Sequence, residues 1–330
     1  MRIEAKVPAS VANLGPGFDC IGMAVDRFQL RLSLVPGGEE RSIEVRGVDA
    51  DRIERGPDNL VCRALDEAFR FAGCEPPRGF RLMIDNDIPL ARGLGSSAAA
   101  IVGGLLLARE WLLAGDVLLS LEDIADLAVS LEGHGDNVIA ALVGGVAVSV
   151  KGADGVRWQA TRTTEFPALV LAVPESWQKT ADARRLLPAS VPYEDAVYNS
   201  AHTALLIAAL MNGDYAMLRE AMRDRLHEPY RERIYPWLPN VRRAALEAGA
   251  FGVSLSGAGP STAAFVPAGN ISSVMQAMAS AYREAGLRAE VYRAAVAGGA
   301  LARTVPAGDG VSWPHAEPLE VSRGLSGGAP

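Results

Sequence analysis

A glycine-rich segment, PLARGLGSSAA (Pro89 to Ala99), joins a strand pattern to a long helix pattern. Residues 78–84 alternate apolar and polar side chains, as a half-buried strand does. Residues 96–113 are rich in Ala and Leu and predict a buried helix. The chain therefore places its glycines between the end of a strand and the start of a helix.

The two glycines of this segment, Gly93 and Gly95, allow positive φ and close approach of the backbone to an anion. Amides at the start of the following helix then point at that anion, and the helix dipole adds to the attraction. Ser96 and Ser97 can bind phosphate oxygens or a metal ion. The alternative is a helix start that these serines merely cap.

Two other phosphate-binding loops can be compared with this segment. A Walker A loop needs Gly-Lys followed by Ser or Thr, and the chain contains neither pair. A dinucleotide-binding fingerprint matches Gly93, Gly95 and Ala98 in spacing. Its acidic residue should end a second strand, whereas the residues before Asp116 continue a helix. A dehydrogenase is therefore a poor alternative.

Two further glycine-rich segments stand near the two ends of the chain: NLGPGFD (Asn13 to Asp19) and SGAGPS (Ser256 to Ser261). Between them, strand and helix patterns are mixed throughout, which indicates an α+β or α/β protein. A helix is expected over residues 58–72, ended by Gly73. A domain boundary is expected within residues 151–167.

Length and charge exclude several classes of function. A chain of 330 residues suggests about two domains. With 32 Lys and Arg against 39 Asp and Glu, it has no basic footprint for nucleic acid or anionic membranes. Three scattered cysteines predict reduced thiols. The N-terminus has no apolar signal segment, and the longest apolar run, residues 98–108, is too short to span a bilayer. A cytoplasmic protein is expected.

The segment from Ile88 to Ala99 resembles the phosphate-binding motif of the GHMP kinases, and the other two glycine segments occur in the family's order. Five segments resemble the homoserine kinases among them: residues 7–26, 132–137 (EGHGDN), 180–188, 224–231 and 254–261. The resemblance implies an α+β fold of two domains, with a first domain like ribosomal protein S5 domain 2 and a ferredoxin-like second domain. The expected ranges are 1–160 and 161–303, followed by a loosely held tail, 304–330.

The resemblance implies that ATP phosphorylates the hydroxyl of L-homoserine, a step of threonine biosynthesis, and that Mg²⁺ assists. Ser97 and Glu132 would hold the ion, and they are expected to be catalytic together with Thr180. Residues expected at ATP are Asn59, Pro89, Leu90, Ala91, Arg92, Gly93, Leu94, Gly95, Ser96, Ser97 and Ala98. Asn59 and the preceding Asp58 also form a good helix cap.

By the same resemblance, homoserine would lie against the glycine turn and the polar motifs. The expected contacts are Asn13, Asp19, His134, Asp136, Arg184, Arg231, Gly257 and Gly259. A carboxylate such as Asp19 accepts hydrogen bonds from an ammonium group, and an arginine fork binds a carboxylate. No catalytic base is assigned. Homoserine kinases are often homodimers, so a homodimer is an expectation. The alternatives are another GHMP kinase, for mevalonate or a sugar, and a GHMP relative that binds a ligand without catalysis.

Overall fold

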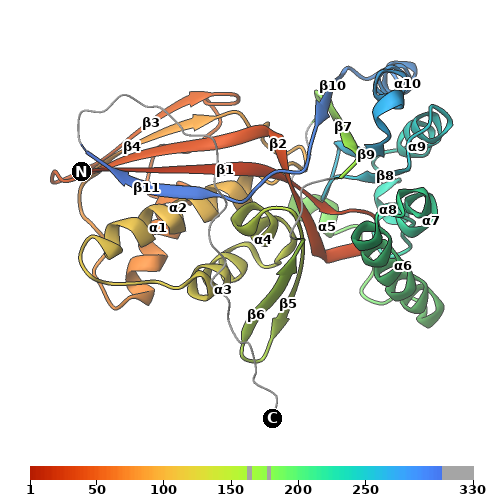
Figure 1. Ribbon diagram of the computed structural model, residues 1–330. Coiled ribbons are helices and arrows are strands. Elements are labelled where there is room, and N and C mark those ends of the chain that lie inside the picture. Colours follow the sequence, from red (N-terminus) through yellow and green to blue (C-terminus); the bar gives the residue numbers. More distant parts are fainter. Residues whose placement is uncertain (162–165, 177–179, 307–330) are drawn as a thin grey trace, which may run out of the picture.

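Two β-sheets, one of seven strands and one of four, organise the chain in a computed structural model that describes residues 1–161, 166–176 and 180–306 (Figure 1). The larger sheet has the order β11-β1-β2-β4-β3, and the hairpin of β5 and β6 joins it through β2. Its strands are β1 (Arg2–Asn13), β2 (Gly17–Pro36), β3 (Arg41–Gly47), β4 (Phe80–Asn86), β5 (Val146–Gly152), β6 (Gly155–Ala160) and β11 (Leu301–Val305).

Four helices accompany this sheet, and together with it they are called the first unit. They are α1 (Leu60–Phe71), α2 (Ser96–Leu113), α3 (Leu121–Glu132) and α4 (Asp136–Val143). By length and composition α2 could cross a membrane, but 61% of it is buried inside the protein. It packs against β1, α1 and α3, so it forms the centre of the core of the first unit. The expected helix over residues 96–113 is confirmed.

The second unit contains the smaller sheet, whose order is β10-β7-β9-β8. Its strands are β7 (Ala168–Pro174), β8 (Gly252–Leu255), β9 (Thr262–Val266) and β10 (Ala289–Ala294). Its helices are α5 (Thr180–Arg184), α6 (Tyr193–Asn212), α7 (Leu218–Ala221), α8 (Glu228–Arg231), α9 (Leu238–Glu247) and α10 (Ile271–Glu284). Helices separate β7 from β8 and β9 from β10, which with this strand order makes the expected ferredoxin-like arrangement.

Strand β7 connects the cores of the two units, because its alternate residues face opposite sides. Val170 and Ala172 pack with α9 and α10, whereas Leu169 and Leu171 belong to a larger cluster that contains the core of the first unit together with residues of α6 and α7. All four side chains are fully buried. The larger cluster therefore continues from the first unit into the second.

Three elements differ from the sequence expectation. Strand β11 pairs antiparallel with β1, Arg2 opposite Val305, so residues 301–305 complete the first unit although a second domain to 303 and a tail from 304 were expected. Its side chains are half-buried or exposed, which leaves no clear alternation. Helix α4 was not expected, because after Asp136 and Asn137 its remaining six residues are all apolar and show no helical period. The sequence pattern predicts one helix over residues 215–225, but only a 3₁₀ turn and the four-residue α7 form there. The rest of the expected tail, residues 307–330, lies outside the described residues.

Candidate active site

A cavity of about 440 Å³ lies where the two units meet, and the motif segments line it. Its wall comes from both units: the β1–β2 turn, the segment before α1, the loop from β4 to α2, the start of α4, α5, α8 and the β8–β9 turn. The predicted residues that line it are Asn13, Asp19, Asn59, Pro89, Leu90, Ala91, Arg92, Gly93, Leu94, Gly95, Ser96, Ser97, Glu132, His134, Asp136, Arg184, Arg231 and Gly257.

Three predicted residues are not among the lining residues. Ala98 is fully buried in the core. Gly259 lies deeper in the β8–β9 turn, where its N–H donates to the Ser256 carbonyl at 2.8 Å. The Thr180 side chain lies outside the described residues.

The loop between β4 and α2 requires its glycines. Gly95, with φ of 71°, is the N-cap of α2, and a Cβ there would approach Ser10 Oγ to 2.1 Å. Gly93, with φ of 73°, would bring a Cβ within 2.1 Å of the Ser256 carbonyl oxygen. No side chain caps α2, so the serines do not have the capping role considered as the alternative. The first amides of α2 are left to an anion in the cavity.

Contacts from both units fix this loop. The Arg92 guanidinium donates to the carbonyls of Pro174 at 2.9 Å and Glu175 at 2.8 Å, both at the end of β7. Ser256 Oγ donates to the Gly93 carbonyl at 2.5 Å. The loop therefore holds its shape through contacts with the second unit as well as the first.

At the start of α2, Ser97 Oγ donates to Glu132 Oε2 at 2.7 Å, and Glu132 is the last residue of α3. A hydroxyl and a carboxylate at the mouth of a phosphate-sized loop are oxygen donors of the kind Mg²⁺ prefers. The donor set therefore fits the predicted metal. A second group, Asp19, His134 and Asp136, brings possible ligand atoms within 4.8 Å of one another.

The apolar end of the cavity lies near α1, where Ile53, Leu60, Val61 and Ile84 are lining residues. Asn59 is 2% exposed, and its side chain caps α1 by accepting from Val61 N at 3.0 Å. The capping role expected for it is confirmed. Spacing could not reveal these apolar residues as site residues, because apolar side chains near a helix start usually belong to the core.

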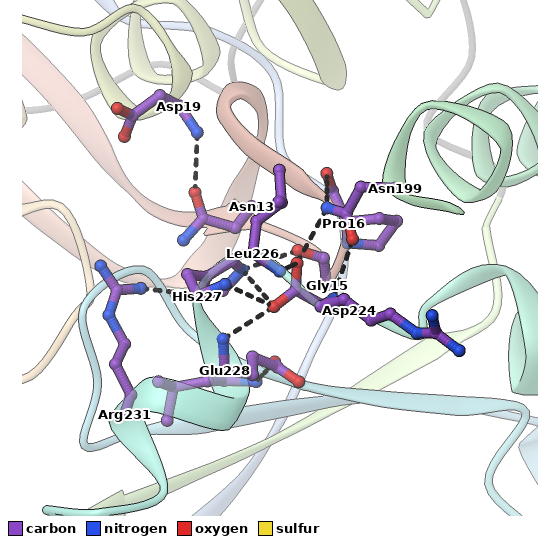
Figure 2. A network of polar contacts seen from close by, with 12 residues as sticks. Asn13, Gly15, Pro16, Asp19, Asn199, Asp224, Leu226, His227, Glu228 and Arg231 are labelled. Carbon is purple, nitrogen blue, oxygen red and sulfur yellow. Dashed lines mark hydrogen bonds and ion pairs between the residues drawn. The ribbon is translucent and has the colours of Figure 1, made fainter. Parts of the chain in front are cut away.

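The opposite end of the cavity is polar and is built on two left-handed residues, Asn13 and Asp19, with φ of 72° and 59°. Asn13 Oδ1 accepts from the Asp19 N–H at 3.1 Å (Figure 2), and Asn13 Nδ2 donates to the Gly257 carbonyl at 3.2 Å. The Asp19 carboxylate takes both donors of the Arg184 fork, at 2.7 and 2.8 Å. Residues from the β1–β2 turn, the β8–β9 turn and α5 are thus brought together as the motifs predicted.

His134 and Asp136 face the same end, with His134 Nδ1 2.5 Å from Asp136 Oδ1. Burial alone would lower the pKa of His134, but the hydrogen bond to Asp136 and the charges of Asp136, Asp19 and Glu132 outweigh it and raise the pKa above the ordinary value. The imidazole therefore carries positive charge more readily than a free histidine.

Arg231 is the most buried cation at this end, with 2% of its surface exposed. Burial holds its pKa below the ordinary arginine value. Its Nη1 donates to His227 Nδ1 and to the Gly257 carbonyl, both at 2.9 Å. Its Nε is buried and has no hydrogen-bond partner among the described residues. Because Arg231 lines the cavity, its guanidinium is placed to meet an oxygen anion there.

Phe18 is a lining residue that motif reasoning missed. The guanidinium carbons of Arg184 and Arg231 lie 5.3 and 5.5 Å from the centre of its ring, and His227 stacks on the ring at 5.1 Å. The aromatic face holds both cations at one end of the cavity. Its position within the NLGPGFD motif was the sequence signal that could have marked Phe18 as a site residue.

Comparison with known proteins gives consistent matches. Models of the GHMP kinases N terminal domain and the GHMP kinases C terminal domain match residues 59–145 and 206–284. The chain is 41% identical to the homoserine kinase of Trichormus variabilis over 88% of its length and 94% of the relative's. It is 43% identical to that of Carboxydothermus hydrogenoformans, with 86% and 91% covered.

Solved structures agree. The structure is similar to the crystal structure of homoserine kinase from Cytophaga hutchinsonii, with a TM-score of 0.80, 27% identity, and 92% and 97% of the two chains covered. L. major mevalonate kinase shares the fold at a TM-score of 0.65 and 17% identity, with 89% and 95% covered. The expected α+β fold with an N-terminal and a C-terminal GHMP domain is confirmed.

Proposed function

Since the chain belongs to the GHMP kinases and, among them, to the homoserine kinases, we propose that its cavity transfers the terminal phosphoryl group of ATP to the hydroxyl of L-homoserine. The product is O-phospho-L-homoserine, and the step belongs to threonine biosynthesis. ATP is the co-substrate. What remains to assign is the part that each cavity residue takes in this reaction.

The phosphates of ATP are assigned to the loop from Gly93 to Ser97, where the uncapped amides at the start of α2 face the cavity. The adenine is assigned to the apolar end near Ile53 and Leu60. Ser97 and Glu132 would hold Mg²⁺. The chemistry that such an ion supplies is neutralisation of charge on the phosphates.

The observation that supports an amino-acid substrate is the group of charged side chains around Phe18. Arg231 offers a buried, unpaired Nε, and Arg184 lies beside it over the same ring. These cations suit the carboxylate of homoserine. Asp19, Asp136 and the Asn13 carboxamide suit its ammonium group. A neutral sugar offers neither charge, which favours homoserine over that alternative.

In the reaction the substrate hydroxyl attacks the γ-phosphorus in line, and the bond from that phosphorus to the bridging oxygen of ADP breaks. Asp19 is ion-paired with Arg184, and Asp136 Oδ1 accepts from the Asn137 N–H at 2.7 Å and lies 2.5 Å from His134 Nδ1. Neither is assigned as a base. The hydroxyl proton leaves late, to an oxygen of the transferred phosphoryl group, and the residues of the chain act by orienting the two substrates.

The test is an ADP-release assay with Mg-ATP that compares L-homoserine with mevalonate, galactose, L-serine and L-threonine. Turnover of homoserine alone, lost in Glu132→Ala, is the expected result. Turnover of mevalonate or galactose instead would keep the fold and overturn the assignment of the arginines. Folded protein that releases no ADP with any of them would favour a ligand-binding relative.

A cytoplasmic location and a homodimer are part of the proposal. For the dimer, support comes from one face of α6, where Tyr193, Val197 and Met211 are 86%, 52% and 64% exposed. Light scattering after size exclusion measures the mass, and Val197→Glu should shift it to that of one chain.

A further inference from the structure

The turn between β1 and β2 is held by the second unit through its backbone carbonyls. His227 Nε2 donates to the Gly15 carbonyl at 2.7 Å (Figure 2). The Pro16 carbonyl accepts from Asn199 Nδ2 at 3.1 Å and Thr203 Oγ1 at 2.9 Å. A Cβ at Gly15 would lie 2.2 Å from the Met222 carbonyl oxygen. The turn that carries Asn13 and Asp19 is therefore seated closely against α6, α7 and α8.

His227 lies between this turn and Arg231, and its two partners require the same tautomer. A backbone carbonyl only accepts, so the Nε2 that faces Gly15 carries the proton. A guanidinium only donates, so the Nδ1 that lies 2.9 Å from Arg231 Nη1 is unprotonated. The side chain is fully buried. A neutral imidazole with its proton on Nε2 satisfies both neighbours at once.

The contact with His227 fixes how Arg231 presents its fork. Both hydrogens of Nη1 are used, one by His227 and one by the Gly257 carbonyl. That leaves Nε and Nη2 on the other side of the guanidinium without a hydrogen bond to the described residues, and Arg231 lines the cavity. Freed from His227, the guanidinium could rotate and turn this side away.

Helix α8, which carries Arg231, has four residues and cannot hold a position by itself. The buried Asp224 carboxylate accepts from the His227 N–H at 2.9 Å and from the Glu228 N–H at 2.7 Å, and Asn199 Nδ2 donates to it at 2.9 Å. The same Asn199 amide holds the Pro16 carbonyl. Asp224 and Asn199 thus fix the start of α8, and His227 fixes the side chain at its end.

We propose that His227 is a positioning residue, which couples the β1–β2 turn of the first unit to Arg231 of the second so that the carboxylate of the amino-acid substrate meets an aligned guanidinium. The inference rests on the proposed function, because it assigns a carboxylate substrate to Arg231. His227 acts through Arg231 and takes no part in phosphoryl transfer.

Two substitutions separate the two contacts of His227. In His227→Gln the amide nitrogen can replace Nε2 toward Gly15, but nothing accepts from Arg231. In His227→Asn the amide oxygen can replace Nδ1 toward Arg231, but the donor to Gly15 is lost. A hydrogen bond that orients a charged group is worth about ten-fold or more in binding, so H227Q should raise the KM for homoserine by about that factor. In H227N most of this increase in the KM for homoserine should be absent. In both variants the KM for ATP should stay within about two-fold of that of the original protein.

A substrate without a carboxylate completes the test. With 3-aminopropan-1-ol in place of homoserine, H227Q and the original protein should show equal kcat/KM, because Arg231 then has no anion to meet. His202→Gln is the control, since His202 lies on α6, its Nδ1 is 2.8 Å from the Tyr198 carbonyl, and it does not line the cavity. It should leave the KM for homoserine unchanged. Unfolding midpoints are recorded for all variants.

The outcomes separate the inference from the function on which it rests. If the original protein does not turn over homoserine, the proposed function fails. If it does, and H227Q keeps the original KM or loses as much with 3-aminopropan-1-ol, the positioning role is overturned. If H227Q does not fold, 15N NMR spectra of the histidines in the original protein test the role instead, because they show which ring nitrogen of His227 carries the proton. A proton on Nε2 of His227 supports the role, and a proton on Nδ1 overturns it.

Discussion

Two side chains predicted to recognise opposite ends of an amino acid, Asp19 and Arg184, are bound to each other. They are 30% and 43% exposed, so solvent screens the pair and it contributes less than about 1 kcal/mol to stability. A substrate with both an ammonium and a carboxylate group can take the place of both partners. Its ammonium group pairs with Asp19, and its carboxylate pairs with Arg184. A substrate with one charge leaves the other partner unpaired.

This exchange predicts the behaviour of Asp19→Asn. The KM for homoserine should rise by about ten-fold, because a charged partner of the ammonium group is lost. With 4-hydroxybutanoate, which lacks the amine, the variant should match the original protein. Initial rates with both substrates measure this, and an equal loss with both would show that Asp19 acts on something other than the ammonium group.

The buried Asp224 carboxyl makes stability depend on pH. Burial would raise its pKa, but the hydrogen bonds from the backbone N–H groups of Glu228 and His227 and from the Asn199 side chain hold it below the ordinary value. Its contribution is therefore present above about 3.9, the pKa in an unfolded chain, and is lost as the pH falls through the lower folded pKa.

Asp224→Asn should remove part of this dependence. The Asn amide can accept hydrogen bonds only at its oxygen, whereas the carboxylate accepts them at both oxygens. The free energy of unfolding of the variant should therefore be lower by about 1–3 kcal/mol at neutral pH. Its midpoint of urea unfolding should then fall less than that of the original protein as the pH is lowered toward about 4. Parallel slopes for the two proteins would show that other carboxylates govern acid unfolding.

Motif spacing located the polar site residues but not the residues that orient them. Asn13, His134 and Asp136 stand in segments whose polar and glycine residues are uncommon together, so sequence alone singled them out. Phe18 and Ile53 were missed, because an apolar or aromatic residue is by default part of a core. The structure was needed to show Arg184 against Asp19, since 165 residues separate them.

At the level of elements, helices with both boundary signals were predictable and those without were not. Residues 60–71 begin after Asn59 and end before Gly73, and the structure has α1 there. Helices α4 and α8 have no such pair of signals. Their positions come from contacts with distant segments, which no local pattern records.

The loop before α2 gives a prediction with a matched control. Gly95 and Gly73 both have φ of 71°, but a Cβ at Gly73 meets nothing within 4 Å, whereas one at Gly95 meets Ser10 Oγ at 2.1 Å. Gly73→Ala should cost only the left-handed strain, about 1–2 kcal/mol of stability. Gly95→Ala should cost more and raise the KM for ATP by about ten-fold or more. An unchanged KM for ATP in Gly95→Ala would place the phosphates elsewhere.

On the scale of the whole molecule, the second unit is inserted between β6 and β11 of the first (Figure 1). The last strand, β11, covers the edge of β1 with five paired residues, and Arg303 donates to the fully buried Glu4 at 2.8 Å. The domain boundary expected at residue 303 missed this pairing, because the partner of β11 lies about 300 residues away in the chain.

Truncation tests the contribution of β11. A chain that ends at Pro306 keeps the strand, and a chain that ends at Ala300 lacks it. The shorter chain should be less stable by about 3 kcal/mol or more, because it loses ladder hydrogen bonds and a partner of a buried carboxylate. Urea unfolding of the two chains gives the difference, and equal midpoints would mean that the strand adds nothing to the sheet.

The pairing of the last strand with the first also sets an order of events during synthesis. Arg2–Lys6 leave the ribosome long before their partners, Leu301–Val305, which are made only after the whole second unit. Until then the outer edge of β1 presents unpaired amides and carbonyls, which other nascent chains can join. A ribosome that stalls anywhere in the second unit therefore leaves a chain with an open edge, and the protein depends on completed translation to close it.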